Sequence, residues 1–336
     1  MSDFSRRPFF SIGITTCNRP EMLRECIESV LGQSFGDFEV IVGNDFTQQK
    51  LSARKMGVED ERIRIMNYPE NIGEMRNMNT LLAASNGRYF TWLADDDMYT
   101  PAFLEAAYSA LVQFDYPACL FTSFIQGSTF PKEVRIDQAK TELLRGAEFL
   151  EQYLSRKLKT MGCGGLFELD YVREIGGVEQ LGTGFSPGSD NLLAIRAGLL
   201  DNVAYINAPL YFLRAHDKSI SWVSRDVKAY KTAQDDLLAK SVQIFNNERL
   251  REDFNRNLFL LLKWCMRDYF SVVKRTGRIK LGTVMDYMVM IYRHSRKLRN
   301  HRCRIMAHAV RSLYALAGHF VTSKAKSRSL VAVEED

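Results

Sequence analysis

Several features that define common protein classes are missing from this sequence of 336 residues. No two of the six cysteines lie at C-x-x-C spacing, so the sequence indicates neither a zinc knuckle nor a redox pair. No apolar run approaches the roughly 20 residues of a membrane-spanning helix, and the N-terminus lacks the apolar stretch of a signal peptide. We therefore predict a soluble cytoplasmic protein whose cysteines stay reduced.

Charge is distributed unevenly along the chain, although the formal net charge is only +5. Residues 226–336 contain 22 Lys and Arg against 11 Asp and Glu, whereas residues 1–225 contain 23 against 29. An acidic front and a basic tail are expected to serve different tasks. We therefore predict two regions, a domain over 1–225 and a basic, mainly helical region over 226–336.

Short apolar segments alternate with helical patterns in the first half of the chain. Segments 9–15, 38–42 and 89–93 predict strands, and Pro20 is well placed as the first residue of a helix. This alternation predicts βαβ units and a doubly wound, mainly parallel α/β sheet. Ligands bind beyond the carboxyl ends of the strands in such sheets. The polar residues that follow these strands are those from Thr15 to Arg19, then Asp45, then Asp95, Asp96 and Asp97.

Three adjacent aspartates directly after an apolar strand require a positive partner, because neighbouring carboxylates repel one another. Oxygen ligands of this kind suit Mg²⁺ or Mn²⁺, which commonly bind substrate phosphates as well. The alternative is a solvated loop that caps the helix near Pro101. Asp45 suits either a ribose contact or a turn. Thr15 suits a base edge or simple β-propensity, and Arg19 suits a phosphate or the surface.

Taken in order, several segments resemble the inverting family-2 glycosyltransferases of bacterial type, which have the GT-A fold. The resemblance covers about residues 8–222 and is specific as an ordered set. Its segments are FFSIGITTCNRPEMLRECIESVLGQSFGDFEVIVGND, NIGEMRN, YFTWLADDDMYTP, GGLFELDYVREIGG, GSD and LRAHDKSIS. It implies a catalytic domain over 1–225, with a donor half over about 1–125 and an acceptor half over about 126–225.

The resemblance also implies roles for individual residues. Asp190 would be the general base. The nucleotide sugar would be bound by Thr15, Arg19, Asp45, Arg76 and Asp95. The metal, Mn²⁺ or Mg²⁺, would be bound by Asp96, Asp97 and His216.

Three of these assignments have alternatives. A literal D-x-D pattern selects Asp95 and Asp97, whereas counting back from Pro101 favours Asp96. Considered alone, Asp190 also suits the cap of a helix over 192–199, and His216 suits a structural role. Phe46 stands where the family usually has glycine, which puts a uridine preference in question.

The function implied is inverting transfer of a sugar from a nucleotide-diphosphate sugar, with UDP-sugars favoured, to an acceptor hydroxyl. The acceptor would be a carbohydrate or lipid-linked molecule in cell-surface polysaccharide, glycolipid or glycoprotein assembly. One alternative is a nucleotidyltransferase, but that class needs a Gly-rich loop after the first strand and residues 15–20 contain no glycine. A second alternative is an inactive nucleotide-binding scaffold.

The basic tail is densest between residues 274 and 328, where 14 Lys and Arg accompany one acidic residue, Asp286. It suits a solvated helical face, an anionic membrane surface or nucleic acid. Nucleic acid ranks last, because aromatic residues do not interleave the basic ones. We predict peripheral attachment to the inner face of the plasma membrane through residues 274–328.

Overall fold

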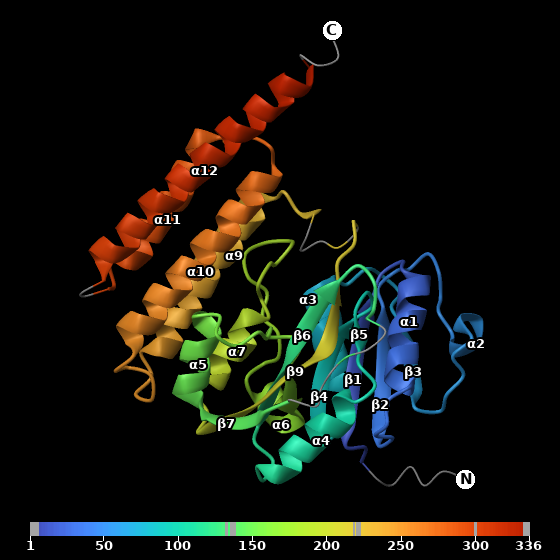
Figure 1. Cartoon of the computed structure of the whole chain (residues 1–336). Coiled ribbons are helices and arrows are strands. Elements are labelled where there is room, and N and C mark those ends of the chain that lie inside the picture. Colours follow the sequence, from blue (N-terminus) through green and yellow to red (C-terminus); the bar gives the residue numbers. More distant parts are fainter. Residues whose placement is uncertain are drawn as a thin grey trace. The chain divides into compact units, whose positions relative to one another are not determined.

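The computed structural model describes residues 7–131, 134, 139–217, 219, 223–298 and 301–331, with residues 318 and 320–331 described by their backbone alone. Its chain forms two compact units (Figure 1). The sheet unit comprises Met1–Glu179 and Asp190–Ser219, and the helical unit comprises Gln180–Ser189 and Ile220–Asp336. Segment 180–189 thus belongs to the helical unit although it lies within the predicted first domain.

The sheet unit is built on one sheet of nine described strands, in the order β3-β2-β1-β4-β8-β6-β9-β5, with β7 paired to β9. Four neighbouring strands are parallel: β1 Phe10–Thr16, β2 Phe38–Asn44, β3 Ile63–Asn67 and β4 Tyr89–Ala94. The remaining strands are β5 Met98–Tyr99, β6 Cys119–Gly127, β7 Thr141–Arg145, β8 Leu166–Glu168 and β9 Asn202–Arg214. The predicted mainly parallel α/β sheet is therefore present.

Helices connect the strands of the sheet unit and cover the sheet (Figure 1). They are α1 Pro20–Leu31, α2 Ala53–Met56, α3 Glu74–Ala84, α4 Phe103–Gln113, α5 Gly146–Leu154, α6 Leu169–Glu174 and α7 Asn191–Ala197. Helix α1 begins at Pro20, as predicted, because a residue at the first helical position needs no free N–H. Segment 126–160 contributes β7, which pairs with β9.

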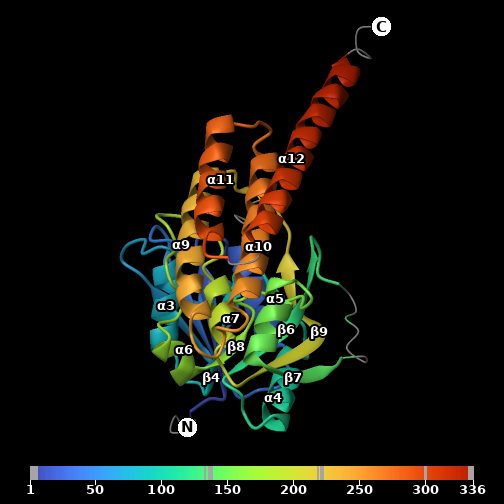
Figure 2. The same ribbon diagram turned by 90° about the vertical axis from the view of Figure 1, so that its left-hand side faces the viewer.

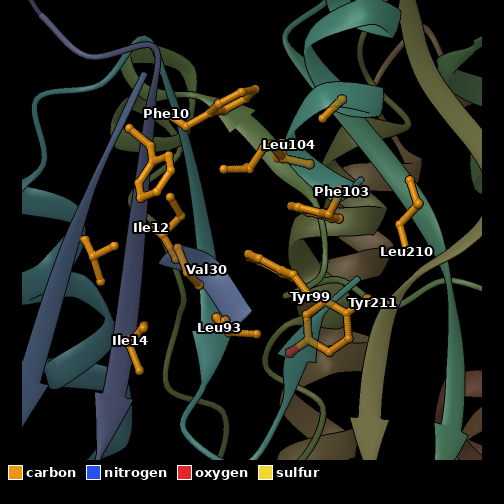
Figure 3. Packing of buried hydrophobic residues seen from close by; sticks show 14 of the residues in the cluster. Phe10, Ile12, Ile14, Val30, Leu93, Tyr99, Phe103, Leu104, Leu210 and Tyr211 are labelled. Carbon is orange, nitrogen blue, oxygen red and sulfur yellow. The ribbon is translucent and has the colours of Figure 1, made fainter. Parts of the chain in front are cut away.

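The main core of the sheet unit lies between the parallel strands and helices α1 and α4. Figure 3 shows Phe10, Ile12 and Ile14 of β1 facing Val30, Leu93 and the aromatic side chains that follow the aspartate run. The Tyr99 and Phe103 rings stack with their centroids 3.9 Å apart. Each buried side chain of this size stabilises the fold by about 1.5–3 kcal/mol. The core therefore packs residues on both sides of the aspartate run and fixes its position.

The helical unit contains α9 Val227–Phe245, α10 Phe254–Arg275, α11 Leu281–Ser295 and α12 Arg302–Val331. Helices α11 and α12 lie on one side of the pair formed by α9 and α10 (Figure 2). The Tyr269 and Tyr287 rings stack at 3.5 Å, and the Tyr287 hydroxyl donates to Gln234 Oε1 at 2.7 Å. Within the described ranges, no helix combines the length and the apolar character needed to cross a bilayer.

Candidate active site

Three parallel strands bring their carboxyl ends to one edge of the sheet. Thr15 of β1 pairs in register with Gly43 of β2 and with Ala94 of β4. The next residues along each strand, Thr16 and Asp95 among them, are therefore neighbours. A side chain at Gly43 would meet the Asn77 side chain at 2.0 Å, so glycine lets α3 approach this edge closely.

The aspartate run forms a tight turn, closed by a hydrogen bond from Asp97 N to Ala94 O at 3.0 Å. The three carboxylates bind different partners as a result. Asp95 is fully buried, accepts a hydrogen bond from Thr16 Oγ1 at 2.5 Å and lies 2.9 Å from Arg19 Nη2. Burial raises the pKa of Asp95 to about 6, and the Arg19 charge and the Thr16 hydrogen bond oppose that rise.

Asp96 binds the two cationic or potentially cationic side chains of the site. Its Oδ2 atom accepts from Arg19 Nη1 at 2.7 Å and lies 2.8 Å from His216 Nε2. Arg19 thus bridges Asp95 and Asp96. The structure brings together four of the residues predicted from the sequence: Arg19, Asp95, Asp96 and His216.

Asp97 is turned away from this group toward β9. Its two oxygens accept hydrogen bonds from the Tyr211 hydroxyl at 2.8 Å and from Arg214 N at 2.9 Å. Burial raises the pKa of Asp97, and the nearby charge of Asp96 raises it further. Asp97 therefore ties the end of β4 to β9, the strand that leads to His216.

Asp45 forms hydrogen bonds with the loop that precedes α3. Its carboxylate accepts hydrogen bonds from Ile72 N at 2.6 Å and Gly73 N at 2.9 Å, and its carbonyl accepts from Asn71 Nδ2 at 3.0 Å. Thr15 lies half-buried at the end of β1, and Arg76 is exposed on the first turn of α3. Their predicted contacts with a nucleotide sugar, like that of Asp45, stay predictions.

Asp190 precedes α7 and lies against the glycine-rich loop around Gly162. Among the described residues its side chain makes no capping bond to α7, and its Oδ2 instead accepts from Cys163 N at 3.4 Å. A side chain at Gly162 would meet Asp190 O at 1.9 Å, so this position admits only glycine without a shift. Burial raises the pKa of Asp190, which makes its carboxylate a stronger base than an exposed aspartate.

Glu74, at the start of α3, connects the aspartate run with Asp190 electrostatically. Although Glu74 is exposed, partial desolvation of its carboxyl raises its pKa, the charges of Asp190 and Asp96 raise it further, and Arg19 lowers it. Because such charge effects weaken with distance, Asp190 and Asp96 both contribute to the negative potential at Glu74 within the sheet unit.

Some residues of this site were not predicted from the sequence. Thr15 was the threonine predicted to bind the nucleotide sugar, but Thr16 is the one that contacts Asp95. Successive residues of a strand face opposite sides of the sheet, so the two threonines cannot share this role. Tyr211 and Glu74 have no distinguishing sequence signal, and Cys163 contributes a backbone N–H that no side-chain motif encodes.

The donor set fits a divalent cation in part. Across the described residues, no group of three or more His, Cys, Asp and Glu side chains is arranged to hold a metal ion. Asp96 and His216 nevertheless form a carboxylate–imidazole pair, and Mg²⁺ and related ions commonly need only one or two protein ligands beside substrate phosphates. Burial raises the pKa values of Asp95 and Asp97, so a cation bound nearby would stabilise their ionised forms.

The fold is that of the GT-A class. Residues 11–168 belong to the family described as Glycosyl transferase family 2. This match confirms the predicted family over these residues, and the relatives described next are bacterial.

Similar proteins agree with this assignment over part of the chain. An uncharacterized glycosyltransferase of Rickettsia typhi is 32% identical over 108 residues, which is 32% of this chain and 33% of the relative. The GalNAc(5)-diNAcBac-PP-undecaprenol beta-1,3-glucosyltransferase of Campylobacter jejuni is 32% identical over 109 residues, covering 32% and 34%. The chain thus spans about a third of the length of the curated relatives it matches.

Solved structures confirm the predicted GT-A fold. Residues 1–349 of S. aureus TarS superpose with a TM-score of 0.63 at 15% identity, over 94% of this chain and 92% of that chain. The same protein in complex with UDP-GlcNAc gives a TM-score of 0.64 at the same coverage.

Proposed function

We propose that this protein is an inverting glycosyltransferase that moves a sugar from a nucleotide-diphosphate sugar to an acceptor hydroxyl. The observation that supports this most is the pairing of Asp96 with Arg19 and His216. The charges of Asp190 and Asp96 both raise the pKa of Glu74, which supports a shared acidic site. The group around Asp96 suits a diphosphate, and Asp190 suits an attacking hydroxyl. Membership of residues 11–168 in glycosyl transferase family 2 supports the same activity.

The donor is held at the carboxyl ends of β1, β2 and β4. Thr15, Asp45 and Arg76 bind the nucleotide part, and Asp95, oriented by Thr16, binds the ribose. Arg19 turns from the carboxylates toward the diphosphate. A UDP-sugar is the favoured donor, and UDP-GlcNAc is the ligand of the TarS complex of similar fold.

Asp96 and His216 would hold Mn²⁺ or Mg²⁺, which supplies a Lewis acid for the negative charge of the leaving diphosphate. Asp97 was predicted beside them, and we assign it a positioning role because both of its oxygens already accept hydrogen bonds. Through Tyr211 and Arg214 it holds β9, and so His216, against the aspartate run.

Asp190 acts as the general base. It takes the proton of the acceptor hydroxyl while that oxygen forms a bond to the anomeric carbon. The bond from this carbon to the diphosphate oxygen breaks, and its electron pair leaves with the nucleoside diphosphate. One displacement of this kind inverts the anomeric centre. The Cys163 N–H donates a hydrogen bond to the carboxylate of Asp190 and so helps to position it.

The acceptor is a carbohydrate or lipid-linked molecule in the assembly of a cell-surface polysaccharide, glycolipid or glycoprotein. A lipid-linked acceptor accords with the curated relative from C. jejuni, whose name describes a polyprenol-linked substrate. Peripheral attachment to the inner face of the plasma membrane through the basic tail would bring the enzyme close to such an acceptor.

The test is turnover of UDP-, GDP- and dTDP-sugars by the full chain in Mn²⁺, with and without a chelator. We expect release of a nucleoside diphosphate that stops when the chelator is added. Metal-independent turnover would contradict the proposal. Release of pyrophosphate would indicate a nucleotidyltransferase, and nucleotide binding without turnover would indicate a scaffold.

Asp190→Asn separates binding from chemistry. It should keep donor affinity and lower transfer by about 10²–10⁴-fold, the usual contribution of a general base. Asp170→Asn is the matched control, because Asp170 is an exposed aspartate of α6. Transfer at the wild-type rate in Asp190→Asn would place the base elsewhere.

A further inference from the structure

Helix α11 exposes a continuous line of apolar side chains. Leu281, Met285, Val289 and Tyr292 are 72%, 54%, 64% and 44% exposed. Their spacing of three or four residues places them on one face of the helix. The other side of α11 is buried in the helical unit through Val284, Tyr287, Met288 and Ile291. Only one of the two apolar sides is therefore covered by the described part of the chain.

Basic side chains surround the end of this apolar line. Arg296 and Lys297 are exposed just beyond the end of α11. Arg302, at the start of α12, places its guanidinium 4.6 Å from the centre of the Tyr292 ring and donates to the Tyr292 hydroxyl. Asp286 is the one acidic residue between positions 274 and 328. The exposed line is thus apolar at its centre and strongly positive at one end.

We propose that this face, made of Leu281, Met285, Val289, Tyr292, Arg296, Lys297 and Arg302, docks on an anionic phospholipid surface. A helix that lies in the membrane interface combines an apolar face with Lys and Arg beside it. The four apolar side chains would enter the boundary between headgroups and acyl chains. The long basic side chains would keep their stems along this layer and their charges among the phosphates.

Charge favours a lipid surface over a second copy of the chain as the occupant. Two copies related by a two-fold axis bury the same patch against itself. Whichever way the two helices run, Arg296, Lys297 and Arg302 would find little opposite charge on the copy, because Asp286 is the one acidic residue between positions 274 and 328. An anionic bilayer instead presents the opposite charge over the whole face. This inference rests on and deepens the proposed membrane contact of the basic tail; it concerns the helical unit alone, and its vesicle test does not depend on the transferase activity.

Vesicle co-sedimentation of the full chain tests the proposal. The probes are vesicles of phosphatidylcholine alone and of phosphatidylcholine mixed with phosphatidylglycerol. We expect binding to the mixed vesicles that weakens with added salt, and much weaker binding to phosphatidylcholine alone. Equal binding to both vesicles, or no binding to either, would overturn the proposal.

Two pairs of substitutions separate the apolar and the basic contributions. Met285→Ser with Val289→Ser should lower vesicle affinity at least about tenfold, because the apolar area that enters the interface is reduced. Arg296→Glu with Lys297→Glu should lower it at least about 25-fold, because each basic residue near an anionic surface contributes about fivefold. These four side chains are exposed, so thermal unfolding should stay close to that of the wild type.

Matched controls come from exposed side chains of the sheet unit. Val112→Ser changes an apolar residue that is 44% exposed on α4, and Arg54→Glu with Lys55→Glu reverses two exposed charges on α2. Both should bind the mixed vesicles like the wild type. If the α2 charge variant lost as much affinity as the α11 variants, binding would depend on net charge alone and the assigned face would be wrong. A wild-type dimer that Met285→Ser with Val289→Ser separates, with unchanged vesicle binding, would assign the face to a second copy.

Discussion

His216 Nε2 lies 2.8 Å from Asp96 Oδ2, although the two residues are 120 positions apart in the chain. Asp97 makes this contact possible, because it binds Tyr211 and Arg214 on the strand that leads to His216. Two adjacent aspartates thus have different tasks. Asp96 faces the expected ligand together with His216, and Asp97 binds the strand that leads to His216.

Asp96→Asn should remove metal-dependent turnover, because it replaces the carboxylate that pairs with both Arg19 and His216. We expect a loss of at least about a hundredfold in kcat/KM, and a smaller loss for His216→Ala. Titration of Mn²⁺ in the presence of UDP measures the ion's affinity directly and should weaken for both variants. Asp60→Asn, which changes an aspartate paired with Arg62 away from the site, is the control. Unchanged Mn²⁺ affinity in both site variants would refute the assigned ligand pair.

Arg19→Ala should destabilise the sheet unit as well as weaken donor binding. Asp95 is fully buried and Arg19 is the cation beside it, so removing Arg19 leaves a poorly compensated charge. We expect a loss of about 1–3 kcal/mol in the free energy of unfolding, measured by urea denaturation.

Adding Asp95→Asn to Arg19→Ala should restore part of that stability, because the second change removes the uncompensated carboxylate. Donor affinity should remain low in the double variant, since the guanidinium is still missing. A strictly additive loss of stability in the double variant would mean that the two side chains do not interact energetically.

The sequence predicted the location of the site because each strand is a continuous apolar run that ends at a polar residue. Parallel strands then bring Thr15, Asp45 and Asp95 to one edge of the sheet. It could not distinguish the roles of the three aspartates. Their directions depend on the turn at 94–97 and on Tyr211, which lies 114 positions from Asp97.

The base site shows a second reason for incomplete prediction. Asp190 was identified through a resemblance, but its orientation depends on the N–H of Cys163 and on the missing side chain of Gly162. Neither a backbone N–H nor the absence of a Cβ changes the charge or hydropathy pattern of the sequence, so neither could be predicted from it. The contact of Gly162 with Asp190 appears only in the folded chain.

Gly162→Ala should lower transfer more than donor binding. The new Cβ would meet Asp190 O at 1.9 Å, so the start of α7 must move and carry the Asp190 carboxylate with it. We expect kcat to fall by at least about tenfold, because a displacement on the order of 1 Å is costly in catalysis. Donor affinity, measured by calorimetry, should change little.

Gly164→Ala is the matched control in the same loop. Its Cβ would meet Met161 Cγ at 3.2 Å, and the flexible methionine side chain can yield. Equal losses of kcat in the two variants would indicate that the loop as a whole matters, rather than the contact of Gly162 with Asp190.

The helical unit should lose stability as the pH falls from about 7.5 to 5.5, and His294 should be one cause. Burial lowers the pKa of His294, although its Nε2 lies 2.7 Å from Asp235 Oδ1 and that carboxylate opposes the shift. The unfolded chain therefore binds this proton at a higher pH than the folded chain does. The free energy of unfolding therefore falls as the pH drops below the ordinary histidine pKa near 6.5, with a slope of at most about 1.4 kcal/mol per pH unit for one proton.

His294→Gln should flatten this part of the stability profile, measured by urea unfolding at each pH. The wild type and the variant should have parallel profiles above about pH 8, where the unfolded histidine is neutral. An unchanged slope between pH 7.5 and 5.5 in His294→Gln would assign the acid sensitivity to other groups.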